Sequence, residues 1–250
     1  MAGVEGKVAF LTGAGSGIGR ATALVLAQGG ADVVVTDINL DGAQEVAQEI
    51  SRLGRKTLAL QVDVTQLDAL EAAVAQTKQE LGRVDVLFSN AGIGDLVPFA
   101  DLTEAEWDRM FDVHLNGTYN CFRAVLPDML DSGWGRLIST CSTGAFTGGI
   151  GVAHYCAAKA GIAGLTVAMA SELARTGVTV NAVAPGPIDT PMVRQSSERW
   201  VERIIKTVPM RKLGGAEDIA YAAVYLASDE AGFMTGQIVS PNGGLYTKWC

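Results

Sequence analysis

The chain has 250 residues, of which 48 % are hydrophobic and 18 % are charged, so it can bury a large core, and intrinsic disorder is excluded. Its net charge of −8 disfavours a nucleic-acid partner, because phosphate backbones would be repelled. We find no basic segment followed by an apolar stretch near the start and no apolar run of about 18 residues. We therefore expect a cytoplasmic protein without signal peptide or membrane span.

The four cysteines, Cys121, Cys141, Cys156 and Cys250, form no CxxC pair, and the chain has two histidines. So few and so scattered potential ligands predict that the protein has no metal site. The cysteines are predicted to be reduced thiols. Cys141 and Cys156 lie close in sequence to the residues identified below as catalytic, so a redox role stays open.

Short valine-rich runs alternate with longer segments of helical periodicity. Strands are predicted at 8–11, 33–36, 58–62, 84–88, 137–140 and 178–183, and helices at 19–28, 42–53, 66–81 and 104–130. Thr103 and Glu106 form a capping box before the last of these helices. The strands lack polar alternation, as in a parallel sheet covered on both faces. The pattern predicts a doubly wound, Rossmann-type three-layer α/β fold with a mainly parallel sheet, in one domain spanning 1–250.

A glycine-rich loop follows the first predicted strand and precedes a helix. It reads Thr-Gly-Ala-Gly-Ser-Gly-Ile-Gly over 12–19. Glycines allow the backbone to approach a ligand closely, and the helix N-terminus offers free N–H groups to a pyrophosphate. The loop predicts a dinucleotide site that includes Gly13, Ser16, Gly17, Ile18 and Gly19.

Asp37 ends the second strand at the spacing of a residue that accepts hydrogen bonds from a ribose. Its carboxylate would repel the 2′-phosphate of NADP, and Ser16 supplies no compensating charge, so NAD is the predicted cofactor. A helix cap is the alternative role for Asp37. After the third strand, Asp63 and Val64 are candidates for the adenine end, and Asp63 can equally cap the helix that begins near Gln66.

Tyr155 and Lys159 lie four residues apart, which places them on one face of a helix. A tyrosine with a pKa of about 10 is a poor base at neutral pH. A lysine cation about 4 Å away contributes roughly 4 kcal/mol at an effective dielectric of 20, or about three pKa units. The pair is therefore expected to bring the phenol into the range of acid–base catalysis. Ser142 follows the fifth strand, and a rigid Pro-Gly-Pro turn at 185–187 follows the sixth.

These motifs together resemble the short-chain dehydrogenase/reductase family. The resemblance covers the glycine loop, the Asn90-Ala91-Gly92 triplet, Ser142, the YxxxK pair and the Asn-Ala-Val-Ala-Pro-Gly run, in order, over essentially the whole chain. It implies that Tyr155 exchanges a proton with the substrate oxygen, that Ser142 hydrogen-bonds that oxygen, and that Lys159 binds the nicotinamide ribose and lowers the tyrosine pKa. It also implies cofactor contacts from Asn90, Ala91, Gly92, Pro185, Gly186, Ile188 and Thr190.

Two positions depart from the family pattern. His114 stands where an asparagine commonly holds a water in a proton relay; an imidazole can do the same, and a packed histidine without a catalytic part is the alternative. In 240–244, Asn242 stands where an aspartate often precedes the paired glycines, and no consequence for the chemistry follows from the sequence.

The resemblance further implies a substrate lid over 187–213. Together with the segment after Ser142, it is expected to line a mostly apolar pocket with Gly144, Ala145, Phe146, Val152, Met192 and Trp200. The basic residues of the lid interleave with Glu198 and Glu202, which favours a solvated helix face over an anion site. Many small residues between 157 and 170 favour close pairing of helices in a homo-oligomer, by resemblance a homotetramer.

We expect an NAD-dependent oxidoreductase that interconverts a lipophilic or cyclic secondary alcohol and its ketone. The alternative is a 3-oxoacyl-thioester reductase or 3-hydroxyacyl-CoA dehydrogenase, which His114 and the basic lid residues favour. A dinucleotide sensor without catalysis is disfavoured, because the chain keeps both Tyr155 and Lys159.

Overall fold

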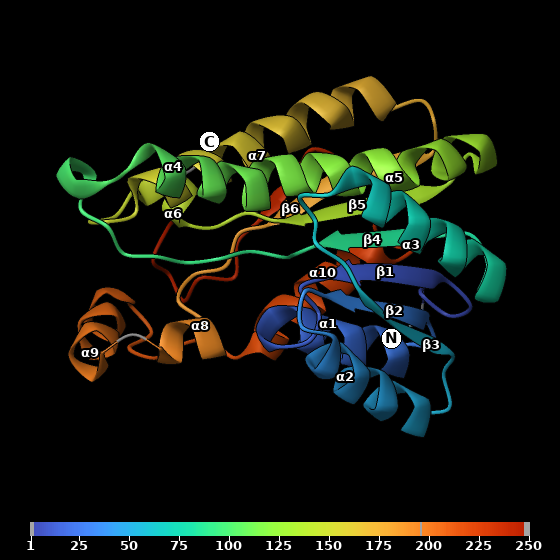
Figure 1. Ribbon diagram of the computed structural model, residues 1–250, viewed down its shortest axis with the longest axis horizontal. Helices are drawn as coiled ribbons and strands as arrows, with labels where there is room; N and C mark the ends of the chain where they lie inside the picture. The colour runs from blue at the N-terminus through green and yellow to red at the C-terminus, as the bar shows by residue number, and fades with distance from the viewer. Residues whose placement is uncertain (1–2, 196, 248–250) are drawn as a thin grey trace.

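A computed structural model describes residues 3–195 and 197–247, so Ser196 of the predicted lid and Cys250 lie outside the described residues (Figure 1). The strands are β1 (Val8–Thr12), β2 (Asp32–Asp37), β3 (Thr57–Gln61), β4 (Val86–Ser89), β5 (Gly135–Thr140), β6 (Val178–Val183) and β7 (Ile238–Val239). The helices are α1 (Gly17–Gln28), α2 (Leu40–Arg52), α3 (Leu67–Glu80), α4 (Glu104–Phe111), α5 (Gly117–Ser132), α6 (Gly144–Thr147), α7 (Ala153–Leu173), α8 (Pro191–Arg194), α9 (Glu198–Thr207) and α10 (Ala216–Ala227).

The strands form one parallel sheet in the order β3-β2-β1-β4-β5-β6-β7. The six predicted strands are found with ends shifted by at most two residues, and the doubly wound fold is confirmed. The two-residue strand β7 was not predicted, because so short a run carries no periodicity. The order reverses between β1 and β4, and in such sheets ligands bind beyond the carboxyl ends at this point.

Successive residues along each strand enter two separate cores. Ala9 and Leu11 pack with α1, α2 and α10, whereas Phe10 between them packs with α3, α5 and α7. The side chains of a strand alternate between its faces, so both faces of this sheet must be apolar. This explains the valine-rich runs, and Figure 1 shows the two helical layers on opposite sides of the sheet.

The predicted helix over 104–130 is two helices joined by a π-helical turn, Asp112–Asn116. The predicted capping box is present: Thr103 Oγ1 accepts from the Glu106 N–H at 3.3 Å, and the Glu106 carboxylate accepts from the Thr103 N–H at 2.9 Å. The wider turn was not predictable, because its apolar spacing differs little from that of a helix. It turns His114 inward, where the side chain is buried.

Helix α7 corrects the expectation that no segment is apolar enough to cross a bilayer. Its 21 residues include a window with a mean hydropathy of 1.2, which meets that requirement by length and composition. In the fold it packs against β6, α6 and α4 and buries the charged side chain of Lys159. Packing within the domain therefore accounts for part of its apolar character.

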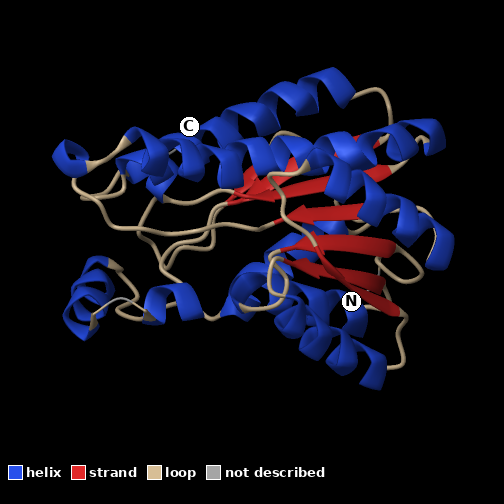
Figure 2. Ribbon diagram, in the orientation of Figure 1, coloured by secondary structure: helices blue, strands red, loops and turns tan. Residues whose placement is uncertain are grey.

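The carboxyl ends of the strands point to the side of the molecule where loops and short helices gather. Figure 2 shows the arrowheads of the sheet directed toward the loops that lead to α6, α8 and α9. The loops after β1, β4, β5 and β6 carry most of the predicted site residues, so the fold brings these residues to one edge.

Candidate active site

The glycine-rich loop leads directly into the N-terminus of α1, and glycine is required at several of its positions. Gly13 and Gly17 have positive φ angles of 61° and 54°. A Cβ at Gly19 would overlap the Gly13 carbonyl oxygen, so only glycine fits there. The N-cap residue Ser16 makes no capping hydrogen bond with its side chain. The first N–H groups of the helix are thus not satisfied by the cap, which suits an anionic group such as a pyrophosphate.

Asp37 lies directly beside this loop. Its Oδ2 accepts a hydrogen bond of 2.9 Å from the Gly15 N–H, and its Oδ1 accepts one of 2.9 Å from the Asn39 N–H. Asn39, not Asp37, is the N-cap residue of α2. The structure therefore disfavours the helix-cap alternative and places the carboxylate where β2 ends next to the glycines.

Asp63 and Val64 are both engaged within the protein. Asp63 Oδ1 accepts 2.9 Å hydrogen bonds from the N–H and the hydroxyl of Thr65, which is a local turn. The Val64 carbonyl accepts from Asn120 Nδ2 at 3.0 Å. The N-cap residue of α3 is Gln66, so the helix-cap role considered for Asp63 is not found, and its contact with the adenine stays a prediction.

Asn90 connects the ends of three strands. Its Nδ2 donates to the carbonyl oxygens of Thr12 and Gly13 at 3.2 and 3.1 Å, and its Oδ1 accepts from Thr140 Oγ1 at 3.2 Å. The N–H groups of Asn90 and Ala91 donate to Thr12 Oγ1. The triplet thus holds the glycine loop against the ends of β4 and β5.

Ser142, Tyr155 and Lys159 come together after β5. A Cβ at Gly144 would lie 3.3 Å from Ser142 Oγ and 3.6 Å from Tyr155 Cε1, so this glycine sits beside both reactive side chains. Ser142 Oγ accepts from the Gly144 N–H at 3.1 Å. The Lys159 ammonium donates a 2.6 Å hydrogen bond to the Thr140 carbonyl and lies 5.7 Å from the centre of the Tyr155 ring.

The electrostatics correct one expectation from the sequence. Burial raises the pKa of Tyr155 above its usual value, while a hydrogen bond with Ser142 acts in the lowering direction. Burial also lowers the pKa of Lys159 to about 8. The sequence predicted a lowered tyrosine pKa, whereas in the protein by itself burial raises it, and Lys159, 5.7 Å from the centre of the ring, does not offset this effect.

His114 is buried and packs edge-on against the Tyr155 ring, with 5.3 Å between ring centres. Its Nε2 lies 3.1 Å from the Ile93 nitrogen and 2.8 Å from the Ile93 oxygen, so it bonds one or the other according to its tautomer. Within the described residues Nδ1 is buried without a hydrogen-bond partner. Burial and the charge of Lys159 hold the pKa of His114 well below its usual value, so the ring is neutral at neutral pH.

The turn after β6 lies against the glycine loop. A Cβ at Gly17 would be 3.5 Å from Thr190 Cγ2. Ile188 is buried and pairs with Gly214, and Thr190 Oγ1 accepts from the Val193 N–H at 3.4 Å, which caps α8. Together with Pro185 and Gly186, these residues form the predicted nicotinamide side of the site.

The predicted substrate residues are only partly brought together. Gly144, Ala145 and Phe146 belong to α6 beside Ser142, and Val152 directly precedes α7. Met192 on α8 reaches the loop after β4, since a Cβ at Gly94 would lie 3.0 Å from its Sδ. Trp200 lies on α9, and its contact with the substrate stays a prediction.

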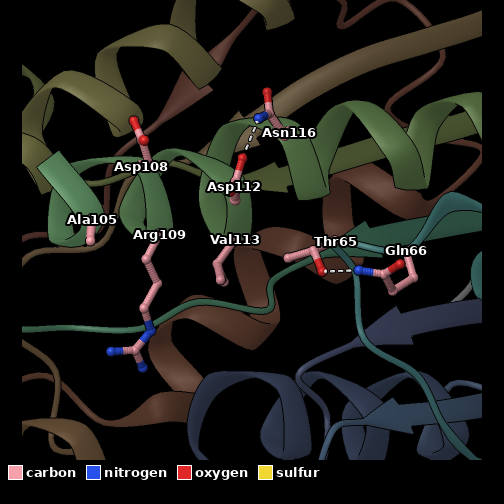
Figure 3. A pocket seen from close by; sticks show the side chains of 8 residues that line it. All are labelled: Thr65, Gln66, Ala105, Asp108, Arg109, Asp112, Val113 and Asn116. Carbon is pink, nitrogen blue, oxygen red and sulfur yellow. Dashed lines mark hydrogen bonds between the residues drawn. The ribbon is translucent and has the colours of Figure 1, made fainter.

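A cavity of about 460 Å³ lies apart from these side chains, between the turn after β3 and the junction of α4 with α5. Figure 3 shows its lining: Thr65, Gln66, Ala105, Asp108, Arg109, Asp112, Val113 and Asn116. Hydrogen bonds of 2.7 Å from Asn116 to Asp112 and 2.9 Å from Gln66 to Thr65 engage some of its polar groups. The cavity borders the predicted adenine end and not the reacting centre.

The thiols near the site are protonated at neutral pH. Burial raises the pKa of Cys141 and Cys156, and it raises the pKa of Cys121 to about 12. A thiolate is the reactive form of cysteine, so these values give no support to the redox role that the sequence left open.

One side chain near the site was missed by the sequence analysis. Tyr246 stacks on Phe146 with ring centres 5.1 Å apart and 21° between the ring planes. The paired glycines at 243–244 signalled a turn before it, but no sequence pattern indicates which distant ring Tyr246 meets.

Comparisons with known proteins agree with this geometry. A family described as enoyl-(acyl carrier protein) reductase matches residues 13–246. The chain is 40 % identical to the hydroxy(phenyl)methylsuccinyl-CoA dehydrogenase subunit BbsD of Thauera aromatica, over 97 % of both chains. It is 38 % identical to a 3-oxoacyl-(acyl-carrier-protein) reductase of Thermotoga maritima, over 97 % of this chain and 98 % of that protein. The crystal structure of levodione reductase matches with a TM-score of 0.93 and 34 % identity, over 96 % of this chain and 97 % of that one.

The chain therefore belongs to the short-chain dehydrogenase/reductase family, as its motifs predicted. It is an oxidoreductase that acts on CH–OH or keto groups with a nicotinamide cofactor.

Replacing Tyr155 by Phe tests the acid–base assignment. We expect turnover to fall at least about 100-fold, because a positioned proton donor contributes on that scale, while NADH binding stays nearly intact. Steady-state kinetics and NADH titration measure the two effects, with the exposed Tyr119→Phe as the matched control. Activity retained in Y155F would show that another group exchanges the proton.

The pKa of Lys159 predicts a pH-dependent stability. An unfolded lysine titrates near 10.4, so between about 8 and that value the unfolded chain binds more protons and stability rises with pH. We expect the free energy of unfolding of the wild type relative to Lys159→Met to rise by about 1 kcal/mol from pH 7 to pH 9. Denaturant titrations at both pH values measure it, and the comparison cancels the other titrating groups. A constant difference would mean that the folded lysine keeps an ordinary pKa.

Proposed function

We propose that this chain is an NAD(H)-dependent enzyme that interconverts a 3-hydroxyacyl thioester and the corresponding 3-oxoacyl thioester. The observation that carries the reaction class is the meeting of Ser142, Tyr155 and Lys159 at the end of β5, next to a loop that fits a dinucleotide. The thioester is the substrate class that two of the relatives support by name.

The residues present fit a dinucleotide, because Gly13 and Gly17 have positive φ angles and Gly19 packs against the Gly13 carbonyl, which forms a tight loop that leads into the N-terminus of α1. Asp37 would bond the adenosine ribose, Lys159 the nicotinamide ribose, and the turn from Pro185 to Thr190 the carboxamide. When bound, the nicotinamide supplies or accepts the hydride at C4.

Charge near the adenosine ribose favours NAD over NADP. The Asp37 carboxylate beside Gly15 would repel a 2′-phosphate. Arg20, the basic residue that follows the loop, is held by Glu49 through bonds of 2.9 and 2.7 Å from Nη2 to the two carboxylate oxygens. Its guanidinium is already paired, so it offers little compensation for an added phosphate.

Tyr155, Ser142 and Lys159 exchange the proton at the substrate oxygen and stabilise the charge that develops there. The Tyr155 hydroxyl donates a proton to the oxygen during reduction and takes it back during oxidation. Ser142 hydrogen-bonds the same oxygen and stabilises its developing charge. Lys159, whose ammonium is fixed by the Thr140 carbonyl, places a positive charge beside the phenol as the phenolate forms.

His114 acts as a neutral support of this proton path. The edge of its ring contacts Tyr155, and Nε2 fixes Ile93 in the loop after β4. Its buried Nδ1 is a polar atom suited to a water that links Lys159 to the outside, as the resemblance implied. A charged imidazole is disfavoured, because burial and, after it, the positive charge of Lys159 lower the pKa of His114.

Basic residues of the lid are only weakly available to a coenzyme A phosphate. Arg194 is paired with Asp189 through bonds of 2.7 and 2.8 Å. Arg199 and Arg203 lie on α9, where each directly follows a glutamate, Glu198 and Glu202. The thioester proposal therefore rests on the relatives and the catalytic geometry, not on a built phosphate site.

A cyclic secondary alcohol is the second candidate substrate. The likeness to levodione reductase over 96 % of the chain favours it. The apolar character of Phe146, Val152 and Met192 is compatible with either substrate class.

The proposed function is tested by NADH formation with a panel of 3-hydroxyacyl-CoA thioesters and simple cyclic and aryl alcohols. We expect kcat/KM to be highest for the thioesters with NAD. Turnover confined to cyclic alcohols would establish the second candidate, and no turnover of any secondary alcohol would overturn the proposal.

Asp37→Ser tests the cofactor assignment. Loss of the carboxylate removes its hydrogen bonds to the ribose, so we expect NAD to bind about tenfold more weakly. It also removes the repulsion of the 2′-phosphate, so the preference for NAD over NADP should decrease. Kinetics with both cofactors measure the ratio, with the exposed Asp41→Ser as the matched control. An unchanged ratio in D37S would place the ribose elsewhere.

Helix α7 supports a homo-oligomer, and by resemblance a homotetramer. A third of its apolar window is buried within the protomer, and Val167 is 49 % exposed. An apolar helix face of small residues permits close packing against a second copy of the same helix.

A further inference from the structure

Asn242, one of the two positions that depart from the family pattern, organises the turn near the end of the described chain. Its Nδ2 donates to Ser240 Oγ at 2.9 Å and to the Tyr246 carbonyl at 3.0 Å. Its Oδ1 accepts from the N–H groups of Gly244 and Tyr246 at 2.9 and 3.4 Å. An aspartate could accept the last two bonds but could not donate the first two.

This turn is fastened to the nicotinamide side of the site. The Ser240 hydroxyl donates to the Ala184 carbonyl at 2.7 Å, and the Pro241 carbonyl accepts from the Gly186 N–H at 3.1 Å. The backbone fits closely, since a Cβ at Gly186 would lie 2.7 Å from Asn242 Cα.

The same turn also contacts the end of the lid. The Met210 N–H donates to the Gly243 carbonyl at 3.1 Å, and a Cβ at Gly244 would lie 3.2 Å from the Pro209 ring. The turn is thus held from two sides, and it presents the Tyr246 ring in one place.

The Tyr246 ring lies against the Phe146 ring of α6, the helix that follows Ser142. Phe146 is four residues after Ser142, on the helix that begins at Gly144 beside Ser142 and Tyr155. Tyr246 stacks on Phe146 at 5.1 Å, and Phe146 still keeps 36 % of its surface exposed. Two nearly parallel rings therefore meet at α6, the helix that begins beside Ser142 and Tyr155, and the Phe146 ring keeps apolar surface uncovered.

We propose that Tyr246 and Phe146 form an aromatic wall of the substrate site that selects a planar aryl group on the carbinol carbon, and that Asn242 is the residue that positions this wall. The inference rests on the proposed function, since it names the substituent that the same site takes. Aromatic rings prefer offset-stacked or edge-to-face contacts with other rings, beyond the burial of apolar area. A saturated ring of equal size gains the burial but not this preference.

The test compares matched substrates in the wild type and in Tyr246→Leu, which keeps apolar volume but removes the ring. The probes are 3-hydroxy-3-phenylpropionyl-CoA against its cyclohexyl counterpart, and 1-phenylethanol against 1-cyclohexylethanol. We expect the phenyl-to-cyclohexyl ratio of kcat/KM to fall about fivefold, the scale of one aromatic pair. Phe146→Leu should lower the same ratio, which covers the case in which Y246L fails to fold.

Two further variants separate the ring from other effects. Tyr246→Phe keeps the ring, so the ratio should stay within about twofold of the wild type. Phe233→Leu removes a fully exposed ring elsewhere and should leave the ratio unchanged.

Asn242→Asp tests the positioning role. It keeps the Tyr246 side chain but loses two donated hydrogen bonds, so KM for the phenyl substrate should rise more than KM for the cyclohexyl one. A drop in kcat equal for both substrates would indicate a general structural defect and overturn the positioning role.

The outcomes separate the two proposals. An unchanged phenyl-to-cyclohexyl ratio in both Y246L and F146L, with secondary alcohols still oxidised, overturns the aromatic wall and leaves the proposed function standing. Failure of the wild type on the four probes alone, with other 3-hydroxyacyl-CoA thioesters turned over, also overturns the aromatic wall, whereas failure on every secondary alcohol of the panel overturns the proposed function itself.

Discussion

The side-chain amide of Asn90 is the contact on which the assembly of the site depends. It donates to two carbonyl oxygens at the end of β1 and accepts from the Thr140 hydroxyl at the end of β5. Three parallel strands thereby end at fixed distances from one another, although nothing in a parallel sheet by itself fixes the loops beyond it. The glycine loop follows the carbonyl groups to which Asn90 donates, and the Ser142 segment follows the hydroxyl from which Asn90 accepts. The position of a dinucleotide relative to the reacting side chains follows from these hydrogen bonds.

Low polarity around the reacting groups sets their protonation. Burial raises the pKa of Tyr155, lowers that of Lys159 to about 8 and holds that of His114 well below its usual value. All three shifts favour the neutral form, because charge is costly where water is excluded. Such a site accommodates one cation, and Lys159 is best placed to carry the charge because its ammonium donates a hydrogen bond to the Thr140 carbonyl. A neutral His114 beside a charged lysine is the arrangement with the least repulsion.

Much of the fold was predictable, because burial on both faces of a parallel sheet leaves a clear pattern in the strands. The loop glycines, Ser142 and the Tyr155–Lys159 pair were also predictable, since their roles require a residue type at a fixed local spacing. The π-helical turn that directs His114 inward was not, because one extra residue in a helical turn barely changes the periodicity. The bond from Gly15 to Asp37 and the stack of Tyr246 on Phe146 join residues far apart in sequence. Such contacts depend on the packing of whole elements, about which local patterns say nothing.

Segments near both ends of the described chain contribute to the candidate site. The loop after β1, the first strand in sequence, provides the glycines, whereas the turn of Asn242 follows β7, the last strand, and bonds the segment after β6. Between these lie β4 and β5, which carry Asn90 and Ser142. No contiguous half of the sequence therefore contains a complete site, even though the glycine loop alone is recognisable as a dinucleotide motif. The residues proposed to bind the cofactor, to exchange the proton and to contact the substrate are thus spread along the described chain, and they follow the same strands that form the sheet.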